Sequence, residues 1–184
     1  MFTLTREQFA RYFPEFEKIR AEDLKEKLLQ IWQKAASESD WDTIEDIPFS
    51  PDYPAKPNSF VQHVRLVTAY SYAVAVKNNE LEETKADIDV VVAGALLHDV
   101  CKIVEYSAKG GRTPWGRNVT HGVYGVALSH EAGIPLEIIH VIASHTAKLS
   151  MANKSREAVI VAKCDSIAAS GVHLYEAARK EGNV

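Results

Sequence analysis

The sequence is poor in cysteine and contains no long apolar run. Its only two cysteines, Cys101 and Cys164, are too few for the disulfide framework of a small secreted scaffold. No uninterrupted apolar stretch approaches the ~18 residues that a membrane span needs. The opening residues, MFTLTREQFARYF, lack the basic region and apolar run of a secretion signal. We therefore expect a cytoplasmic protein that has no membrane partner.

An excess of positive charge is also absent. The chain has 21 Lys and Arg against 25 Asp and Glu, a net charge of −4. Such a balance gives no overall attraction to a nucleic-acid polymer, so any recognition of an anion must be local. The 46% of hydrophobic and 25% of charged residues are ordinary for a globular protein, and 184 residues allow a substantial core.

Helical periodicity dominates the chain, and it has no alternating strand pattern of useful length. Residues 1 to about 40 repeat apolar side chains at intervals of three and four, which predicts an amphipathic helical arm that packs on the domain or on a partner subunit. Four prolines between Trp41 and Asn58 exclude a regular helix and predict an ordered loop. Further helices are predicted over residues 60–77, from about 89 to the His98-Asp99 pair, over 120–132 and over 155–170. Another is predicted to begin at about Pro135 and to reach His145.

These patterns predict an all-α protein, a compact helical bundle with an N-terminal helical arm. We divide it into an arm and proline-rich loop, residues 1–57, and a helical domain, residues 58–184. The arm is compatible with a homodimer, but the sequence leaves the oligomeric state open.

Histidine is the residue type that points to chemistry. Five of the seven histidines lie between His98 and His145, and His98 is followed directly by Asp99 at the end of an apolar helix. Adjacent residues on a helix point about 100° apart, so these two side chains cannot point in the same direction. They can, however, both bind one ligand beyond the helix end, or two ligands that lie close together. A metal ion, or a pair of ions bridged by Asp99, is the simplest such ligand.

Other helices direct potential ligands inward as well. His63 shares a helix face with Leu66, Val67, Tyr70 and Val74, and His145 lies on an apolar stripe. His121 opens a helix, with Thr120 as its expected cap. Asp165 lies in an apolar helix, where a carboxylate without a partner costs several kcal/mol or becomes protonated. A cation among these groups satisfies it most simply.

We therefore predict that His63, His98, Asp99 and Asp165 surround one ion, and that His121 and His145 hold a second. The competing interpretation is that inward histidines are hydrogen-bonded core residues and that a lysine neutralises Asp165. His130 and His140 are weaker candidates, and His173 is expected at the surface. Oxygen and imidazole ligands without thiolates suit Fe, Mn, Mg or Zn.

These residues in this order resemble the HD superfamily of metal-dependent phosphohydrolases. The family pattern is a histidine, the His-Asp doublet and a later aspartate, matched here by His63, His98-Asp99 and Asp165. The doublet often continues as His-Asp-x-Gly-Lys, whereas this chain has Cys101 before Lys102. The resemblance covers about residues 58–172.

Family members with two additional histidines between the doublet and the final aspartate hold two metals, and His121 and His145 match those positions. The resemblance therefore implies a six-ligand dinuclear site with two divalent ions, Fe or Mn being favoured over Mg or Zn. It implies a hydrolase that acts on a phosphate ester or phosphoanhydride of a nucleotide or other small metabolite through a metal-activated water.

Asp99 and Lys102 are the expected catalytic residues. Lys102 would offset charge on the transferred phosphoryl group, and the competing interpretation is a salt bridge to a helix end or a carboxylate. Arg112, Arg117 and Lys148 are candidates for binding substrate phosphates, although for each residue taken alone a solvated surface charge is the better-supported interpretation.

Two other functions remain open at this stage. The same ligands suit a di-iron oxygenase of the myo-inositol-oxygenase type, and the basic residues after the doublet only mildly favour phosphate. The metal cage also suits a non-catalytic regulatory module whose partner surface is the helical arm.

Overall fold

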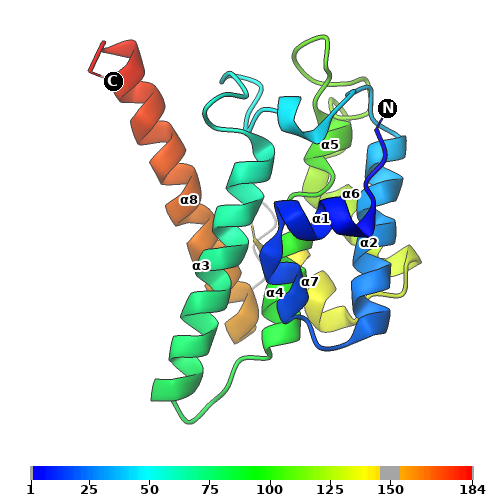
Figure 1. Cartoon of the computed structure of the whole chain (residues 1–184), viewed down its shortest axis with the longest axis vertical. Coiled ribbons are helices and arrows are strands. Elements are labelled where there is room, and N and C mark those ends of the chain that lie inside the picture. Colours follow the sequence, from blue (N-terminus) through cyan, green and yellow to red (C-terminus); the bar gives the residue numbers. More distant parts are fainter. Residues whose placement is uncertain (1, 146–153, 184) are drawn as a thin grey trace.

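The computed structural model describes residues 2–145 and 154–183 and is built from helices (Figure 1). No strand occurs in these two ranges, which contain only the isolated bridges Pro48–Ser59 and Tyr106–Arg112. The predicted all-α class is therefore confirmed. The elements are α1 (Arg6–Tyr12), η1 (Pro14–Lys18), α2 (Glu22–Ser37), η2 (Ile44–Asp46), α3 (Phe60–Leu81), α4 (Ile88–Leu97), α5 (Lys102–Glu105), α6 (His121–Glu131), α7 (Leu136–Ser144) and α8 (Arg156–Lys180).

Side-chain caps fix where the long helices begin. Ser59 accepts the backbone N–H of Gln62 at the start of α3, and Ser155 caps α8 in the same way. Both helices continue past their predicted ends, α3 to Leu81 and α8 to Lys180. The later turns carry many polar residues, so apolar periodicity alone ended these helices too early.

Helix α4 lies at the centre of the bundle, in contact with α2, α3, α7 and α8. All residues from Val91 to Leu97 are buried, which explains why the helix is apolar on every side. At Gly94 an added Cβ would lie 2.6 Å from Val141 Cγ1, so the glycine allows α4 and α7 to approach closely. Because α4 ends at Leu97, the His98-Asp99 pair emerges in the interior.

The N-terminal helices pack onto α4 within the same hydrophobic core. Phe9 lies 5.0 Å from Phe13 and 4.9 Å from Phe16, measured between ring centroids. Trp32 Nε1 donates to the carbonyl of Leu96 at 3.1 Å. The arm therefore packs on the domain, one of the two placements expected for it, while the boundary at residue 57 stays a prediction.

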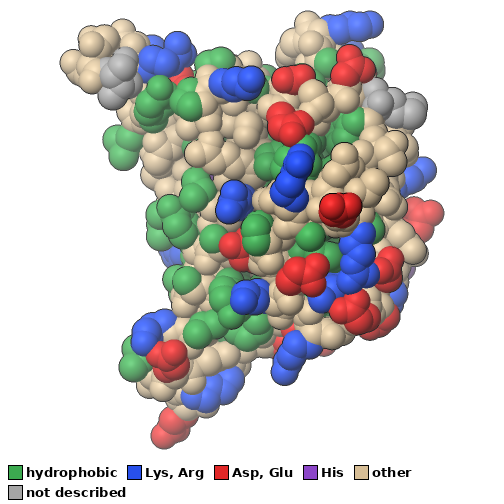
Figure 2. Space-filling view, in the orientation of Figure 1, with side chains coloured by type: hydrophobic (Ala, Val, Ile, Leu, Met, Phe, Trp, Pro, Cys, Tyr) green, Lys and Arg blue, Asp and Glu red, His purple; other side chains and the backbone are tan. Residues whose placement is uncertain are grey.

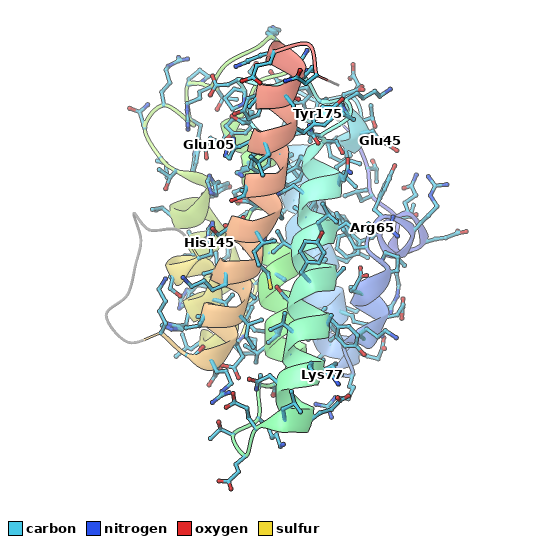
Figure 3. All side chains as sticks on the ribbon, turned by 90° about the vertical axis from the view of Figure 1, so that its left-hand side faces the viewer. Glu45, Arg65, Lys77, Glu105, His145 and Tyr175 are labelled. Atoms are coloured by element: carbon cyan, nitrogen blue, oxygen red, sulfur yellow. The ribbon has the colours of Figure 1, made fainter. Side chains whose placement is uncertain are left out.

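Helices α3 and α8 run side by side as the two longest elements, and both pass the end of α4 (Figures 1 and 3).

Positive and negative side chains are interspersed over the face of the molecule shown in Figure 2. Among the described helices, none is long and apolar enough to cross a membrane.

Candidate metal centre

Five helices bring the six predicted ligands to one place in the interior. His63 lies in α3, His98 and Asp99 follow α4, His121 is the first residue of α6, His145 follows α7, and Asp165 lies in α8. Neighbouring histidine rings have centroids 5.2–5.7 Å apart. The structure therefore brings all six side chains together, and their roles as metal ligands stay predictions.

The carboxylate of Asp99 faces a pair of histidines with each of its oxygens. Oδ2 lies 3.3 Å from Nε2 of both His63 and His98. Oδ1 lies 3.1 Å from His121 Nε2 and 3.6 Å from His145 Nε2. The donor atoms of His63, His98 and Asp99 therefore form one close triad, and those of Asp99, His121 and His145 form a second. This arrangement suits two adjacent cations bridged by one carboxylate.

Asp165 completes the first triad from the α8 side. Its Oδ1 lies 3.2 Å from His63 Nε2 and 3.8 Å from His98 Nε2. Its side chain is 22% exposed, whereas that of Asp99 is 3% exposed. The apolar neighbours of Asp165 predict a buried carboxylate, but the side chain is only partly buried, because Asp165 lies at the rim of the cluster.

Buried nitrogens without partners show that the cluster fits a metal. Nε2 of His63, His98 and His145 is inaccessible to water and has no hydrogen-bond partner in the described structure. A buried polar atom left in this state costs about 1–3 kcal/mol. Imidazole nitrogens that lack hydrogen-bond partners, together with the carboxylate oxygens they face, form a donor set for Fe, Mn or Zn.

Hydrogen bonds on the far side of the rings determine which nitrogen faces the centre. Nδ1 of His98 lies 2.6 Å from the carbonyl oxygen of Ala95, and Nδ1 of His145 lies 2.7 Å from that of Ile142. A carbonyl oxygen can only accept, so each Nδ1 carries the proton and donates. When the ring is neutral, Nε2 therefore presents a lone pair to the centre, the form that binds a metal.

His121 is oriented by a carboxylate that our sequence analysis missed. Glu105, 1% exposed, lies with Oε2 2.6 Å from His121 Nδ1 and accepts the backbone N–H of His121 at 2.8 Å. Its other oxygen is ion-paired with Arg112. Thr120 occupies the predicted cap position of α6, but its side chain makes no capping bond. Glu105 therefore satisfies the helix end in its place.

A signal for Glu105 was present in the sequence. The residue is preceded by Ile103 and Val104 and followed by Tyr106, an apolar setting like that of Asp165. A buried acid in such a run needs a partner. In Figure 3, Glu105 and His145 lie on the same side of α8, although they come from different elements.

Burial and neighbouring charges shift the pKa values of the cluster. Burial would raise the pKa of Asp99, but Lys102 and His98 outweigh it and hold that pKa well below its usual value. Burial would lower the pKa of His98, but Asp99 raises it above the usual value. Burial lowers the pKa of His145. An ionised Asp99 and a neutral His145 are the forms that ligate metals.

Comparison with known proteins places the chain in a family. The HD domain family matches residues 60–170, more than half of the chain. The chain belongs to the HD domain family. The match begins at the first residue of α3 and ends within α8, so it contains all six residues of the centre.

Three curated proteins are similar to parts of this HD domain chain. A dihydroneopterin 2',3'-cyclic phosphate phosphodiesterase of Methanocaldococcus jannaschii is 29% identical over 70% of the chain and 55% of its own length. A tRNA (cytidine(56)-2'-O)-methyltransferase of Thermoplasma volcanium is 33% identical over 46% of the chain and 20% of its own length. A ribonuclease Y of Rubrobacter xylanophilus is 30% identical over 56% of the chain and 18% of its own length. No solved structure matches.

The chain thus spans about half the length of the first of these relatives and about a fifth of the other two.

One departure from the HD pattern, Cys101 in place of glycine, has a structural explanation. Cys101 has φ −80° and ψ 0°, a conformation open to any residue, so glycine is not required there.

Lys102 reaches the centre from the start of α5. Its Nζ lies 2.6 Å from Asp99 Oδ2, and the residue is 9% exposed. Arg112 is engaged by Glu105, and Arg117 donates to the carbonyl of Arg112 at 3.0 Å. Their phosphate-binding roles stay predictions. The third candidate, Lys148, lies outside the described residues.

The remaining histidines are not members of the two groups of close donor atoms found among the described residues. His130 and His173 are exposed, and His140 Nε2 accepts the backbone N–H of Ser155 at 3.1 Å. The helix face assigned to His63 is wrong in part, because Tyr70 and Val74 are 40% and 46% exposed. These side chains lie on the outer surface of α3, where apolar character does not indicate burial.

Proposed function

We propose that this HD domain chain is a phosphohydrolase that depends on two divalent metal ions. The observation that carries the proposal is the position of Asp99, whose two oxygens each face a separate pair of histidines. Membership of the family and the phosphodiesterase relative support hydrolysis of a phosphoester.

The residues divide into two ligand sets that share Asp99. His63, His98 and Asp165 would hold the first ion, and His121 and His145 the second. When bound, the ions would polarise the phosphoryl group and activate a water as nucleophile. Fe or Mn is proposed because the donors are imidazoles and carboxylates without thiolates.

The side chains of the chain itself supply orientation and charge. Asp99 would stay ionised, because nearby cationic groups hold its pKa well below the usual value. Lys102, with Nζ 2.6 Å from Asp99, would place an ammonium where negative charge grows on the phosphoryl oxygens. Glu105 would keep the His121 ring in the orientation that presents Nε2.

For the substrate class we propose a small phosphodiester derived from a nucleotide, with a 2',3'-cyclic phosphate as the first candidate. This rests on the name of the first relative, which is a phosphodiesterase for such a cyclic phosphate. The net charge of −4 gives no general attraction to a nucleic-acid polymer, which favours a small molecule.

The proposal is tested by purifying the protein without added metal, measuring its metal content, and assaying hydrolysis. The substrates are bis(p-nitrophenyl) phosphate and a panel of 2',3'-cyclic nucleotides, each with added Mn²⁺. We expect turnover of at least one diester, with loss of more than about a hundredfold in Asp99→Ala. Asp23→Ala, an exposed acid on α2, is the matched control and keeps wild-type turnover.

Unchanged activity in Asp99→Ala would exclude this mechanism. Bound iron with oxygen consumption and no phosphoester cleavage would point instead to oxygenase chemistry on the same ligands. Bound metal without turnover on any substrate would point to a regulatory role.

A further inference from the structure

The ring of Phe49 touches two groups of the metal centre at once. Its centroid lies 4.5 Å from that of the His63 ring, and Lys102 Nζ lies 4.7 Å from the same Phe49 centroid. Phe49 is 7% exposed, so both contacts are shielded from water. A residue of the proline-rich loop therefore belongs to the wall of the centre.

Backbone bonds anchor the base of the loop that carries Phe49. The Phe49 N–H donates to the carbonyl of Asn58 at 3.4 Å, and the Phe60 N–H donates to that of Ile47 at 2.9 Å. The two ends of the loop are thereby joined directly before α3. Since α3 carries His63 one turn later, Phe49 and His63 are held in a common frame.

Side-chain bonds tie the rest of the loop to α8. Tyr53 Oη lies 2.8 Å from His173 Nδ1, and Asn58 Nδ2 donates to Glu176 Oε1 at 3.1 Å. Glu176 is 1% exposed, so this carboxylate is a buried anchor. The loop is thus fixed to the helix that also supplies Asp165.

Lys102 needs a second partner if Asp99 engages cations. The oxygen to which Lys102 is paired, Asp99 Oδ2, is the one that lies 3.3 Å from both His63 Nε2 and His98 Nε2. A cation held there competes with the ammonium for this oxygen and repels it. An aromatic ring attracts a desolvated ammonium without being a metal ligand.

We propose that Phe49 is a positioning residue, whose ring keeps the Lys102 ammonium at the centre while Asp99 holds the cations. The proposal rests on the function proposed above. It assigns the loop between η2 and α3 a direct part in the site.

A double-mutant cycle tests the coupling. With bis(p-nitrophenyl) phosphate and Mn²⁺, Phe49→Leu should lower kcat about tenfold and leave KM within about twofold, because the ring acts on a group used in the chemical step. Phe49→Tyr, which keeps an aromatic face, should retain most of kcat. In a Lys102→Gln background, Phe49→Leu should cause no further loss, because the partner is already absent.

A second measurement does not depend on activity. Acetylation of the Mn²⁺-loaded protein, followed by mass spectrometry, reports how accessible each lysine is. Lys102 should react several-fold faster in Phe49→Leu than in the wild type. Lys18, which lies 5.7 Å from the Tyr72 ring outside the centre, is the internal control and should not change.

An unchanged acetylation rate at Lys102, or equal losses of kcat with and without Lys102, overturns the proposal. If Phe49→Leu fails to fold, Phe49→Met replaces it, since methionine keeps the volume without an aromatic face. If the wild type hydrolyses no phosphodiester, the proposed function fails, and the acetylation rates still decide whether Phe49 holds Lys102.

Discussion

Asp99 is the residue on which the two halves of the centre depend, because a single carboxylate faces both. Its histidine partners become ligands only if each ring presents Nε2. For three of the four rings, partners outside the centre determine this, whereas His63 Nδ1 is buried without a hydrogen-bond partner in the described structure. Two of those partners are backbone carbonyls three residues earlier in the chain, that of Ala95 for His98 and that of Ile142 for His145. The third, Glu105, is a side chain of α5, so its role can be tested by substitution, unlike that of a backbone carbonyl.

We predict that Glu105→Gln weakens the second ion more than the first. The amide keeps the shape but removes the negative charge that orients His121, and loss of such a partner typically weakens metal affinity about 10–100-fold. Titration of Mn²⁺ into metal-free protein measures both sites. The first site, formed by His63, His98 and Asp165, should keep its affinity.

Glu38→Gln serves as the matched control for that variant. Glu38 also accepts a hydrogen bond, from Tyr124 Oη, but contacts no histidine of the centre in the described structure. Equal weakening of both sites in Glu105→Gln, or the same effect in Glu38→Gln, would contradict a specific role for Glu105.

At the scale of elements, the loop between α5 and α6 contacts Glu105 and its neighbour Val104 and so fixes the position of Glu105. Thr113 N–H donates to the carbonyl of Glu105 at 3.0 Å, and Thr113 Oγ1 donates to that of Val104 at 2.8 Å. Gly116 lies so close that an added Cβ would collide with the Glu105 carbonyl. The loop thus supports Glu105 through backbone contacts, through the Thr113 hydroxyl and through the ion pair with Arg112.

Gly116→Ala should therefore destabilise the fold and disturb the second metal site. Overpacking against backbone atoms costs about 1–3 kcal/mol, because the neighbour cannot rotate away. Urea unfolding measures the free energy, and Mn²⁺ titration measures the site.

Gly171→Ala, in the interior of α8, is the control for this substitution. An added Cβ there meets nothing within 4 Å, so the change should be neutral or stabilise by up to about 1 kcal/mol. A neutral Gly116→Ala would show that the loop can move away from Glu105.

At the scale of the whole molecule, the centre joins helices from both ends of the HD match. α3 and α8 contribute His63 and Asp165 from positions about a hundred residues apart, and α4 lies between them. Buried Nε2 atoms without partners leave this junction under-satisfied. Metal binding therefore favours the folded state, since unfolding separates the ligands.

Removal of metal should lower the melting temperature by about 5–10 °C. This follows from about 2.7 kcal/mol of stabilisation when free metal exceeds the Kd a hundredfold, at about 2–4 °C per kcal/mol for a chain of this size. Thermal unfolding with Mn²⁺ and with a chelator measures the difference. Asp99→Ala should show almost none, and an equal shift in that variant would mean that the metal binds elsewhere.

The sequence by itself determined the all-α class and pointed to the six groups that the structure brings together. These features follow from local periodicity and from the cost of burying charge, both of which are written in neighbouring residues. Only the tertiary structure decided that Glu105 orients His121, that Phe49 contacts His63 and Lys102, and that Arg112 is engaged by Glu105. Such contacts join elements whose relative placement depends on packing of the whole core, so no local pattern encodes them.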